Sequence, residues 1–264
     1  MSRPVIGIVP AAGKATRMPR CICSKELLPI GEAAGIEGCR PKAVSEYLFD
    51  ALVAAEVDRV CVVIAPEKHD ILRFYGSGER HGVPIAYVCQ EVATGMADAI
   101  DAAYPWIGDA TVLMGMPDTI FRPIDALSKL RVLYERERAD LALAVAPTDE
   151  PARLGPVMVD ASGRVLEVLD KPQAPPHNNV WVVACWGATF TEFLHAYLAA
   201  RRPSQAVASG EVALGNIFQA FVERGARVRA LSFDDGLYID AGTMEGLRAA
   251  QSVVASVSTK SVLT

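Results

Sequence analysis

Short apolar runs alternate with amphipathic stretches along the first half of the chain. Continuously apolar runs bounded by Gly, Pro or charged residues are typical of strands that are buried on both faces. They predict strands over 5–9, 59–65, 84–89 and 110–114, and helices over 43–55, 69–76, 96–104 and 125–138. Because such strands pair in parallel inside a helix-covered sheet, the first half is predicted to be an open α/β fold.

The second half has a different pattern, in which strands dominate until helices return near the end. The expected strands are 141–146, 157–160, 165–169, 180–186 and 227–233, and the expected helices are 190–200, 214–224 and 243–257. The tetrapeptide Asp160-Ala161-Ser162-Gly163 has the residues of a tight turn and predicts a hairpin. No repeat or long linker divides the chain, and the Pro-rich loop 172–176 is too short to separate domains. We expect one domain over 1–257, with halves at 1–125 and 126–257, and a tail at 258–264.

Composition narrows the class of protein. A chain of 264 residues with 51% apolar content can bury a large core. No apolar run approaches the ~18 residues that cross a bilayer, and the first run is too short for the core of a signal peptide. We therefore expect a cytoplasmic protein without a membrane partner. The net charge of −5 excludes a globally basic nucleic-acid-binding protein, but a local cluster of cations at Lys14, Arg17, Arg20 and Lys25 could bind small anions.

The six cysteines are scattered along the chain, which favours reduced thiols over a disulfide framework. Cys21, Cys23 and Cys39 could form part of a zinc site. Their spacing differs from the usual two-residue zinc knuckle, however, and no fourth ligand stands nearby in the sequence. Zinc is therefore the weaker interpretation of these residues.

A loop of small residues follows the first predicted strand. Ala11, Ala12 and Gly13 would let backbone N–H groups approach a phosphate, and Lys14 and Arg17 would add positive charge there. These features fit a triphosphate site, although many such loops only join a strand to a helix. The loop matches neither the dinucleotide fingerprint nor the Walker A pattern, which argues against a nicotinamide-dependent dehydrogenase.

Six segments of the chain resemble, in order, those of the sugar-1-phosphate nucleotidyltransferase family. They are 12–18 with 25–30, 90–99, 117–121, 154–157, 170–172 and 239–243. Each is a weak match alone, but together they cover nearly the whole chain. The resemblance implies a Rossmann-like three-layer α/β/α fold with a mixed, mostly parallel central sheet. It also implies an enzyme that transfers a nucleotidyl group from UTP or dTTP to a sugar 1-phosphate and releases pyrophosphate.

The resemblance makes 1–125 a nucleotide-binding half and 126–257 a sugar-phosphate-binding half. It gives each matching position in the nucleotide half a role. The loop from Gly13 to Arg17 would hold the triphosphate, and Ala11, Ala12, Gly13 and Lys14 would bind the nucleotide. Arg17 and Lys25 would stabilise the charge of the phosphates that are displaced. Gln90 and Gly95 would read the Watson–Crick edge of a thymine or uracil.

The same resemblance implies a metal site and a sugar-phosphate site. Asp118 and Asp240 would bind Mg²⁺, whose preference for oxygen ligands suits two carboxylates. The positions expected at the sugar phosphate are Gly155, Asp170, Lys171 and Asn179. Lys171 would be the charge partner of that phosphate, and it joins Arg17, Lys25 and Asp118 in the expected catalytic set. Each position also has an ordinary structural reading, such as a turn-forming aspartate or a surface lysine.

The chain departs from the family pattern near the phosphate loop. Ala15 stands where the family usually has glycine, which puts a methyl group where backbone must approach a phosphate. The interval from Arg17 to Lys25 is shorter than in typical relatives. Because 32–38 is an apparent insertion followed by a second Pro-Lys pair, Lys42 is the alternative to Lys25.

Further departures leave the substrates open. Pro117 and Thr119, on either side of Asp118, are closer to uridylyltransferases than to thymidylyltransferases, and Asp170 replaces a more usual glutamate. The segment 210–214 is similar to one before a late helix of the family but lacks its second acid.

Two other functions stay open. One is a non-catalytic nucleotide- or sugar-sensing domain of the same fold, and the other is a cytidylyltransferase that acts on a non-sugar phosphate such as phosphocholine. Oligomers are common in the family, so the apolar helix at 243–257 could form the interface of a homodimer or homotetramer.

Overall fold

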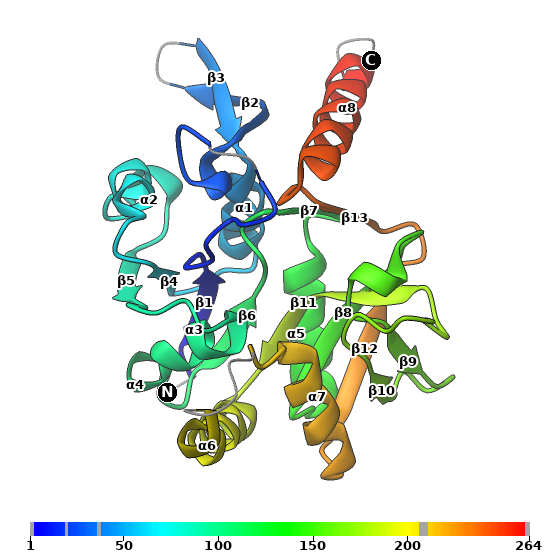
Figure 1. Ribbon diagram of the computed structural model, residues 1–264. Coiled ribbons are helices and arrows are strands. Elements are labelled where there is room, and N and C mark those ends of the chain that lie inside the picture. Colours follow the sequence, from blue (N-terminus) through cyan, green and yellow to red (C-terminus); the bar gives the residue numbers. More distant parts are fainter. Residues whose placement is uncertain (1–2, 19–20, 36–37, 206–210, 262–264) are drawn as a thin grey trace.

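The computed structural model describes residues 3–18, 21–35, 38–205 and 211–261 (Figure 1). Its central element is a sheet of seven strands. The strands are β1 (Val5–Pro10), β4 (Arg59–Ile64), β5 (Ile85–Cys89), β6 (Thr111–Met114), β8 (Leu141–Pro147), β11 (Asn179–Trp186) and β12 (Val228–Ser232). Their order is β12-β8-β11-β6-β1-β4-β5, and all neighbours are parallel except that β11 runs antiparallel to β6 and β8. The expected mixed, mostly parallel sheet is confirmed.

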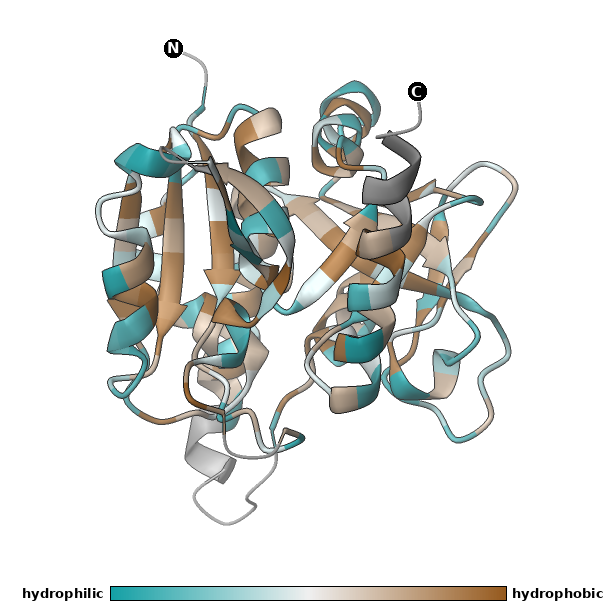
Figure 2. Ribbon diagram, turned by 90° about the horizontal axis from the view of Figure 1, so that it is seen from above, coloured by the Kyte–Doolittle hydropathy of each residue, from teal (hydrophilic) through white to brown (hydrophobic). Residues whose placement is uncertain are grey.

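Helices cover both faces of this sheet. One face carries α1 (Val44–Ala54), α2 (His69–Tyr75) and α5 (Ala126–Glu137), and the other carries α3 (Met96–Ala102), α6 (Ala188–Gln205) and α7 (Leu214–Glu223). Neighbouring residues of a strand point to opposite faces. On β1, Ile6 and Ile8 therefore pack under α3, α6 and α7, whereas Val5 and Val9 pack under α1, α2 and α5. Figure 2 shows the strands as the mostly hydrophobic layer between these helices, so the expected three-layer fold is confirmed.

A hairpin that the sequence pattern did not predict extends from the first half of the chain. It consists of β2 (Pro29–Gly35) and β3 (Gly38–Ala43), which pair antiparallel, and it includes the apparent insertion. Its small and charged residues show no apolar period, which is why it was missed. The C-terminal helix α8 (Met244–Ser261) packs against it, with Val254 beside Ile30. Figure 1 shows the hairpin and α8 at the same end of the molecule.

A second missed pair of strands runs below the hairpin and α8 in Figure 1. β7 (Thr119–Arg122) and β13 (Leu237–Asp240) form an antiparallel ladder that is separate from the central sheet. Each strand has only four residues, too few for an alternating pattern to be recognised. The two expected metal ligands are therefore attached to this ladder rather than to the central sheet.

The predicted turn at Asp160 is confirmed. Its carboxylate accepts hydrogen bonds from the backbone N–H groups of Ser162 (2.8 Å) and Arg164 (3.0 Å). The turn joins β9 (Val157–Val159) to β10 (Val165–Val168). The remaining short elements are α4 (Tyr104–Ile107) and the 3₁₀ turns η1 (Lys25–Leu27), η2 (Glu79–His81) and η3 (Pro151–Arg153).

The C-terminal helix is longer than expected. It continues to Ser261 and so takes up part of the predicted tail, while 262–264 lie outside the described residues. Leu247, Ala250 and Val254 pack inside the chain on Ile30 and Ile239. These apolar side chains thus have partners within the chain. A homo-oligomer interface through this helix stays a prediction. No helix in the described ranges has the length and apolar character needed to span a membrane.

Glu46 on α1 forms hydrogen bonds to the hairpin, and replacing Glu46 with glutamine tests the contribution of these bonds. This buried carboxylate accepts hydrogen bonds from Ala43 N (2.8 Å) and from two guanidinium nitrogens of Arg40 (2.8 and 2.5 Å). We expect Glu46→Gln to lower the free energy of unfolding by about 1–3 kcal/mol at pH 7 in urea titrations. The exposed Glu135→Gln, which removes a surface partner of Arg131, should cost under about 0.5 kcal/mol.

The effect of Glu46→Gln should depend on pH. Burial alone would raise the pKa of Glu46, but the hydrogen bonds from Arg40 and Ala43 outweigh it and lower the pKa. A carboxylate with a lowered pKa stabilises the fold above the pKa of the unfolded chain, about 4.3, and loses this effect as pH falls through the folded value. The difference in the free energy of unfolding between wild type and Glu46→Gln should therefore shrink below about pH 4. A gap that stays constant with pH would contradict this.

Candidate active site

The ladder of β7 and β13 brings together Asp118 and Asp240, which are far apart in the sequence. Asp240 pairs with Thr119, and the N–H of Ala241 donates to the carbonyl oxygen of Asp118 (2.8 Å). The carboxylate of Asp240 also accepts a hydrogen bond from Gly242 N (2.8 Å). The backbone therefore fixes both aspartates relative to each other.

The two carboxylates converge on Gly242. A Cβ atom at this position would lie 2.5 Å from Asp118 Oδ2 and 2.8 Å from Asp240 Oδ1, so the oxygens are no further apart than these two distances together. A side chain here would fill the space between the carboxylates. Two converging carboxylates are a donor set that suits Mg²⁺, which usually takes one or two carboxylates and completes its shell with water and phosphate oxygens.

Each aspartate is paired with a cation from the first half of the chain. Lys25 Nζ lies 2.5 Å from Asp118 Oδ2, and an Arg17 guanidinium nitrogen lies 2.9 Å from Asp240 Oδ2. Burial alone would lower the pKa of Lys25, but the charge and hydrogen bond of Asp118 outweigh it and raise the pKa. The pKa of Arg17 is raised in the same way, with Asp240 outweighing burial. Both side chains are therefore cations at neutral pH.

Lys42, the alternative to Lys25, lies elsewhere. On β3 it forms an ion pair with Asp50, and its ammonium lies 4.2 Å from the centre of the Tyr47 ring. The shorter interval after Arg17 does not prevent Lys25 from reaching Asp118. The structure thus brings Lys25, and not Lys42, to the aspartates.

The phosphate loop leaves the carboxyl end of β1. Ala11 and Ala12 are buried, whereas Gly13 and Lys14 are exposed. Ala15 has a φ of +53°, in the left-handed region that glycine adopts without strain. Glycine would adopt this backbone without the strain that the Cβ atom of Ala15 adds.

Strained backbone occurs in both predicted phosphate-binding segments. Among the described residues, four that are not glycine have positive φ: Ala15, Glu56, Arg138 and Lys171. Glu56 and Arg138 follow the ends of α1 and α5, where left-handed residues are common. Ala15 and Lys171 have no such explanation. Strain of this kind is frequently found at functional sites.

Gln90 and Gly95 lie together at the carboxyl end of β5. The Gln90 amide nitrogen is 3.3 Å from Thr94 Oγ1 and 3.5 Å from the carbonyl oxygen of Gly95. A Cβ atom on Gly95, whose φ is +122°, would lie 2.4 Å from Cγ of Glu211. Glu211 is a candidate site residue that the sequence interpretation missed. Its only signal was the incomplete family match at 210–214.

Two of the residues expected at the sugar phosphate, Lys171 and Gly155, form backbone hydrogen bonds to other segments. Lys171 N donates to Leu154 O (2.9 Å), and Trp181 N donates to Gly155 O (3.1 Å). A Cβ atom on Gly155 would lie 2.2 Å from the indole nitrogen of Trp181, which requires glycine there. The Lys171 side chain is exposed and pairs with no acid in the described ranges. Asp170 lies beside Gly215 at the start of α7.

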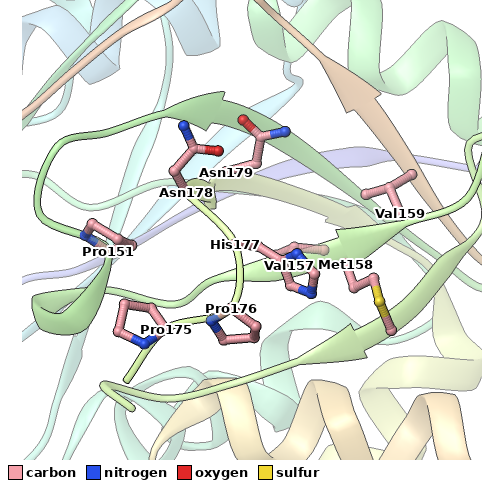
Figure 3. A pocket seen from close by; sticks show the side chains of 9 residues that line it. All are labelled: Pro151, Val157, Met158, Val159, Pro175, Pro176, His177, Asn178 and Asn179. Atoms are coloured by element: carbon pink, nitrogen blue, oxygen red, sulfur yellow. The ribbon is translucent and has the colours of Figure 1, made fainter. Parts of the chain in front are cut away.

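Asn179 lines a hollow in the second half of the chain. The hollow has a volume of about 610 Å³. It is lined by Pro151, Val157, Met158, Val159, Pro175, Pro176, His177, Asn178 and Asn179 (Figure 3). None of these residues contacts the aspartate pair by a hydrogen bond or ion pair in the described part of the chain. Asn179 nevertheless belongs to the same part of the fold as Gly155, because the next residue, Val180, pairs with Pro156.

The zinc interpretation of the cysteines gains no support. Within the described ranges, no group of three or more His, Cys, Asp or Glu side chains could hold a metal ion. Cys39 instead lies 3.1 Å from a carboxylate oxygen of Glu32 on the hairpin.

Comparison with known proteins identifies the family. The model of the nucleotidyl transferase family matches residues 7–256. The chain belongs to this family. It is 29% identical over 242 residues to UTP–glucose-1-phosphate uridylyltransferase AglF of Haloferax volcanii, which covers 90% of this chain and 91% of that protein. It is 26% identical over 255 residues to glucose-1-phosphate thymidylyltransferase of Neisseria gonorrhoeae, covering 95% and 83%.

Solved structures of the nucleotidyltransferases share the fold. A Bacillus anthracis protein assigned as a glucose-1-phosphate thymidylyltransferase, in complex with sucrose, matches with a TM-score of 0.80 at 21% identity and 95% coverage of both chains. A UDP-glucose pyrophosphorylase complexed with UDP-glucose matches with a TM-score of 0.75 at 18% identity, covering 96% and 99%. The family and fold expected from the sequence are confirmed, while the roles of single residues stay predictions.

Replacing Ala15 with glycine should relieve the strain in the phosphate loop of this nucleotidyltransferase. Alanine is disfavoured in the left-handed region, so we expect Ala15→Gly to raise the free energy of unfolding by up to about 1 kcal/mol. Ala33 on β2 has no positive φ, and Ala33→Gly should instead lower the free energy of unfolding by roughly 0.5–1 kcal/mol. Urea unfolding of both variants measures the contrast. A less stable Ala15→Gly protein would show that the left-handed conformation is not strained.

Proposed function

We propose that this nucleotidyltransferase is a Mg²⁺-dependent enzyme that transfers a nucleotidyl group from UTP or dTTP to a sugar 1-phosphate, giving a nucleotide sugar and pyrophosphate. The observation that carries the proposal is the convergence of Asp118 and Asp240, each paired with a cation from the phosphate-loop side. The two relatives named above are a uridylyltransferase and a thymidylyltransferase of glucose 1-phosphate, which makes glucose 1-phosphate the first acceptor to test.

The chemistry is a displacement at phosphorus. A phosphate oxygen of the sugar phosphate attacks the α-phosphorus in line, and the bond from that phosphorus to the pyrophosphate oxygen breaks. The attacking phosphate has a second pKa near ~6 and is mostly a dianion at neutral pH, so no general base is needed. The task of the protein is to bring two anions together.

Electrostatics therefore decides the rate. Two like unit charges ~4 Å apart repel by about 4 kcal/mol at an effective dielectric constant of ~20. Arg17 and Lys25, now bound to carboxylates, would transfer their hydrogen bonds to the phosphates being displaced, and Lys171 would neutralise the acceptor phosphate. Bound Mg²⁺, held by Asp118 and Asp240, would supply Lewis-acid stabilisation of the phosphoryl oxygens.

Gln90 with Gly95 supports a uracil or thymine base. A glutamine amide offers one acceptor and two donors, which complement the imide N–H and the carbonyl oxygens of these bases. Gln90 is only 8% exposed, and its amide contacts are long, at 3.3 and 3.5 Å, so the amide could exchange them for a base. Glu211, which lies against Gly95, reaches the same place from the segment before α7.

The first experiment is an assay of pyrophosphate release in the presence of Mg²⁺. UTP, dTTP, CTP, GTP and ATP are each combined with a panel of sugar 1-phosphates and phosphocholine. We expect release with UTP or dTTP together with glucose 1-phosphate or a related sugar. Release only from CTP with phosphocholine would replace the proposal by a cytidylyltransferase, and nucleotide binding without release from any pair would favour a sensor.

Removing either aspartate should abolish most of the activity. We expect kcat to fall by ~10²–10³-fold or more in Asp118→Ala and in Asp240→Ala, as when a stabiliser of transition-state charge is removed. Asp235, exposed in the turn before β13, supplies the control Asp235→Ala, whose kcat should match wild type. Thermal unfolding verifies that all variants fold. Wild-type rates in folded aspartate variants would remove both residues from the catalytic set.

A further inference from the structure

The start of α2 holds the chain on both sides of Lys25. Ser24 precedes this lysine and Glu26 follows it, in the 3₁₀ turn η1. Asp70 contacts Ser24, and Lys68 contacts Glu26. Lys68 is the residue before α2 and Asp70 lies in its first turn. We call these four residues the α2 clamp: Ser24, Glu26, Lys68 and Asp70.

One side of the clamp is a pair of hydrogen bonds to a carboxylate. The backbone N–H and the hydroxyl of Ser24 donate to the two oxygens of Asp70, each at 2.7 Å. Burial alone would raise the pKa of Asp70, but these bonds and one from Ile71 N outweigh it and lower the pKa. Asp70 is therefore ionised at neutral pH, and bonds to an ionised acceptor are stronger than neutral ones.

The other side of the clamp is a buried ion pair. Glu26 is 2% exposed and Lys68 is 7% exposed, and Lys68 Nζ lies 2.7 Å from Glu26 Oε1. The hydroxyl of Ser45 on α1 donates to the carbonyl oxygen of Glu26 (2.7 Å). The second carboxylate oxygen of Glu26 is buried and has no hydrogen-bond partner. The cost of removing both charges from water offsets most of the attraction in a buried ion pair, so the pair adds little net stability, which suggests another role.

The clamp acts on the position of the Lys25 backbone. A lysine side chain has four flexible bonds, so the reach of its ammonium depends on where its Cα is fixed. No bond in the described residues holds Lys25 itself to α2; the contacts are made by its two neighbours. We propose that Asp70 and the Glu26–Lys68 pair are positioning residues that hold Lys25 on Asp118, and on the triphosphate when it is bound. The second part of this statement rests on the proposed function.

Chemical labelling of lysines tests the positioning without substrate. The side chains of Lys25 and Lys42 are almost equally exposed, at 14% and 15%, and each has an aspartate partner. They are therefore matched probes in one molecule. Each variant is treated briefly with an acetylating reagent, and the rate at each lysine is measured by mass spectrometry.

We expect a crossed pattern of rates. In Asp70→Asn the labelling rate of Lys25 should rise about tenfold, the effect of losing one charge-assisted hydrogen bond, while that of Lys42 stays at the wild-type value. In the control Asp50→Asn, which removes the partner of Lys42, only Lys42 should become faster. The double variant Glu26→Gln/Lys68→Met removes both buried charges together and should give the same result as Asp70→Asn. It takes the place of Asp70→Asn in the test if the Asp70→Asn protein does not fold.

Two results would overturn the proposal. One is an unchanged Lys25 rate in both folded clamp variants. The other is an equal rise at Lys42, which would mean that the clamp merely stabilises the nucleotide half as a whole.

A double-mutant cycle tests the part that rests on catalysis. We expect Asp70→Asn to lower kcat about tenfold in wild type and to have no further effect in Lys25→Met, because coupled residues are not additive. An equal loss in both backgrounds would contradict a role through Lys25. If wild type released no pyrophosphate from any substrate pair, the proposed function would fail, and the labelling rates would still decide whether the clamp positions Lys25.

Discussion

The antiparallel ladder of β7 and β13 is the constraint on which the candidate site depends. Its last pair, Asp240 with Thr119, fixes the backbone beside Asp118, and the bond from Ala241 to Asp118 closes the arrangement. Two carboxylates held this closely repel each other, so the fold must supply cations. It supplies them from the loop after β1, as Arg17 and Lys25. Gly242 leaves the space between the carboxylates open.

The cations of the candidate site depend in turn on elements at the edge of the first half. The turn that carries Lys25 is held between α2 and α1 by Asp70, Lys68 and Ser45. The hairpin of β2 and β3 keeps Lys42 occupied with Asp50 and away from the aspartates. Contacts outside the candidate site thus determine that Lys25, and not Lys42, lies beside the aspartates.

The two halves of the molecule meet at several points of the site. β13 and Glu211 come from the second half, yet they contribute the Asp240 carboxylate and a side chain against Gly95 of the first half. The antiparallel β11 joins β6 of the first half to β8 of the second in one sheet. Because these connections cross the halves, nucleotide and acceptor would be bound by one continuous structure. The left-handed backbone at Ala15 and Lys171 places one strained residue in each half.

Most of the fold could be predicted from the sequence because its signals are local. Continuous apolar runs such as Val5–Pro10, and the turn chemistry at Asp160, determine strands and a hairpin through contacts between near neighbours in the sequence. The order of the family-like segments, from Gly13 to Asp240, was enough to predict the family. It was also enough to name Asp118 and Asp240 as a pair, although not to show how they meet.

What only the tertiary structure decided are contacts between segments that are distant in the sequence. The strands of the β7–β13 ladder are too short to carry a pattern, and the hairpin of β2 and β3 has no apolar period, so neither was apparent locally. The hairpin instead packs against the distant helix α8. The choice of Lys25 over Lys42, the approach of Glu211 to Gly95 and the clamp from Asp70 likewise depend on where remote side chains lie. Local propensity reports the conformation of a segment, whereas a site is a set of distances between segments, and packing alone determines those.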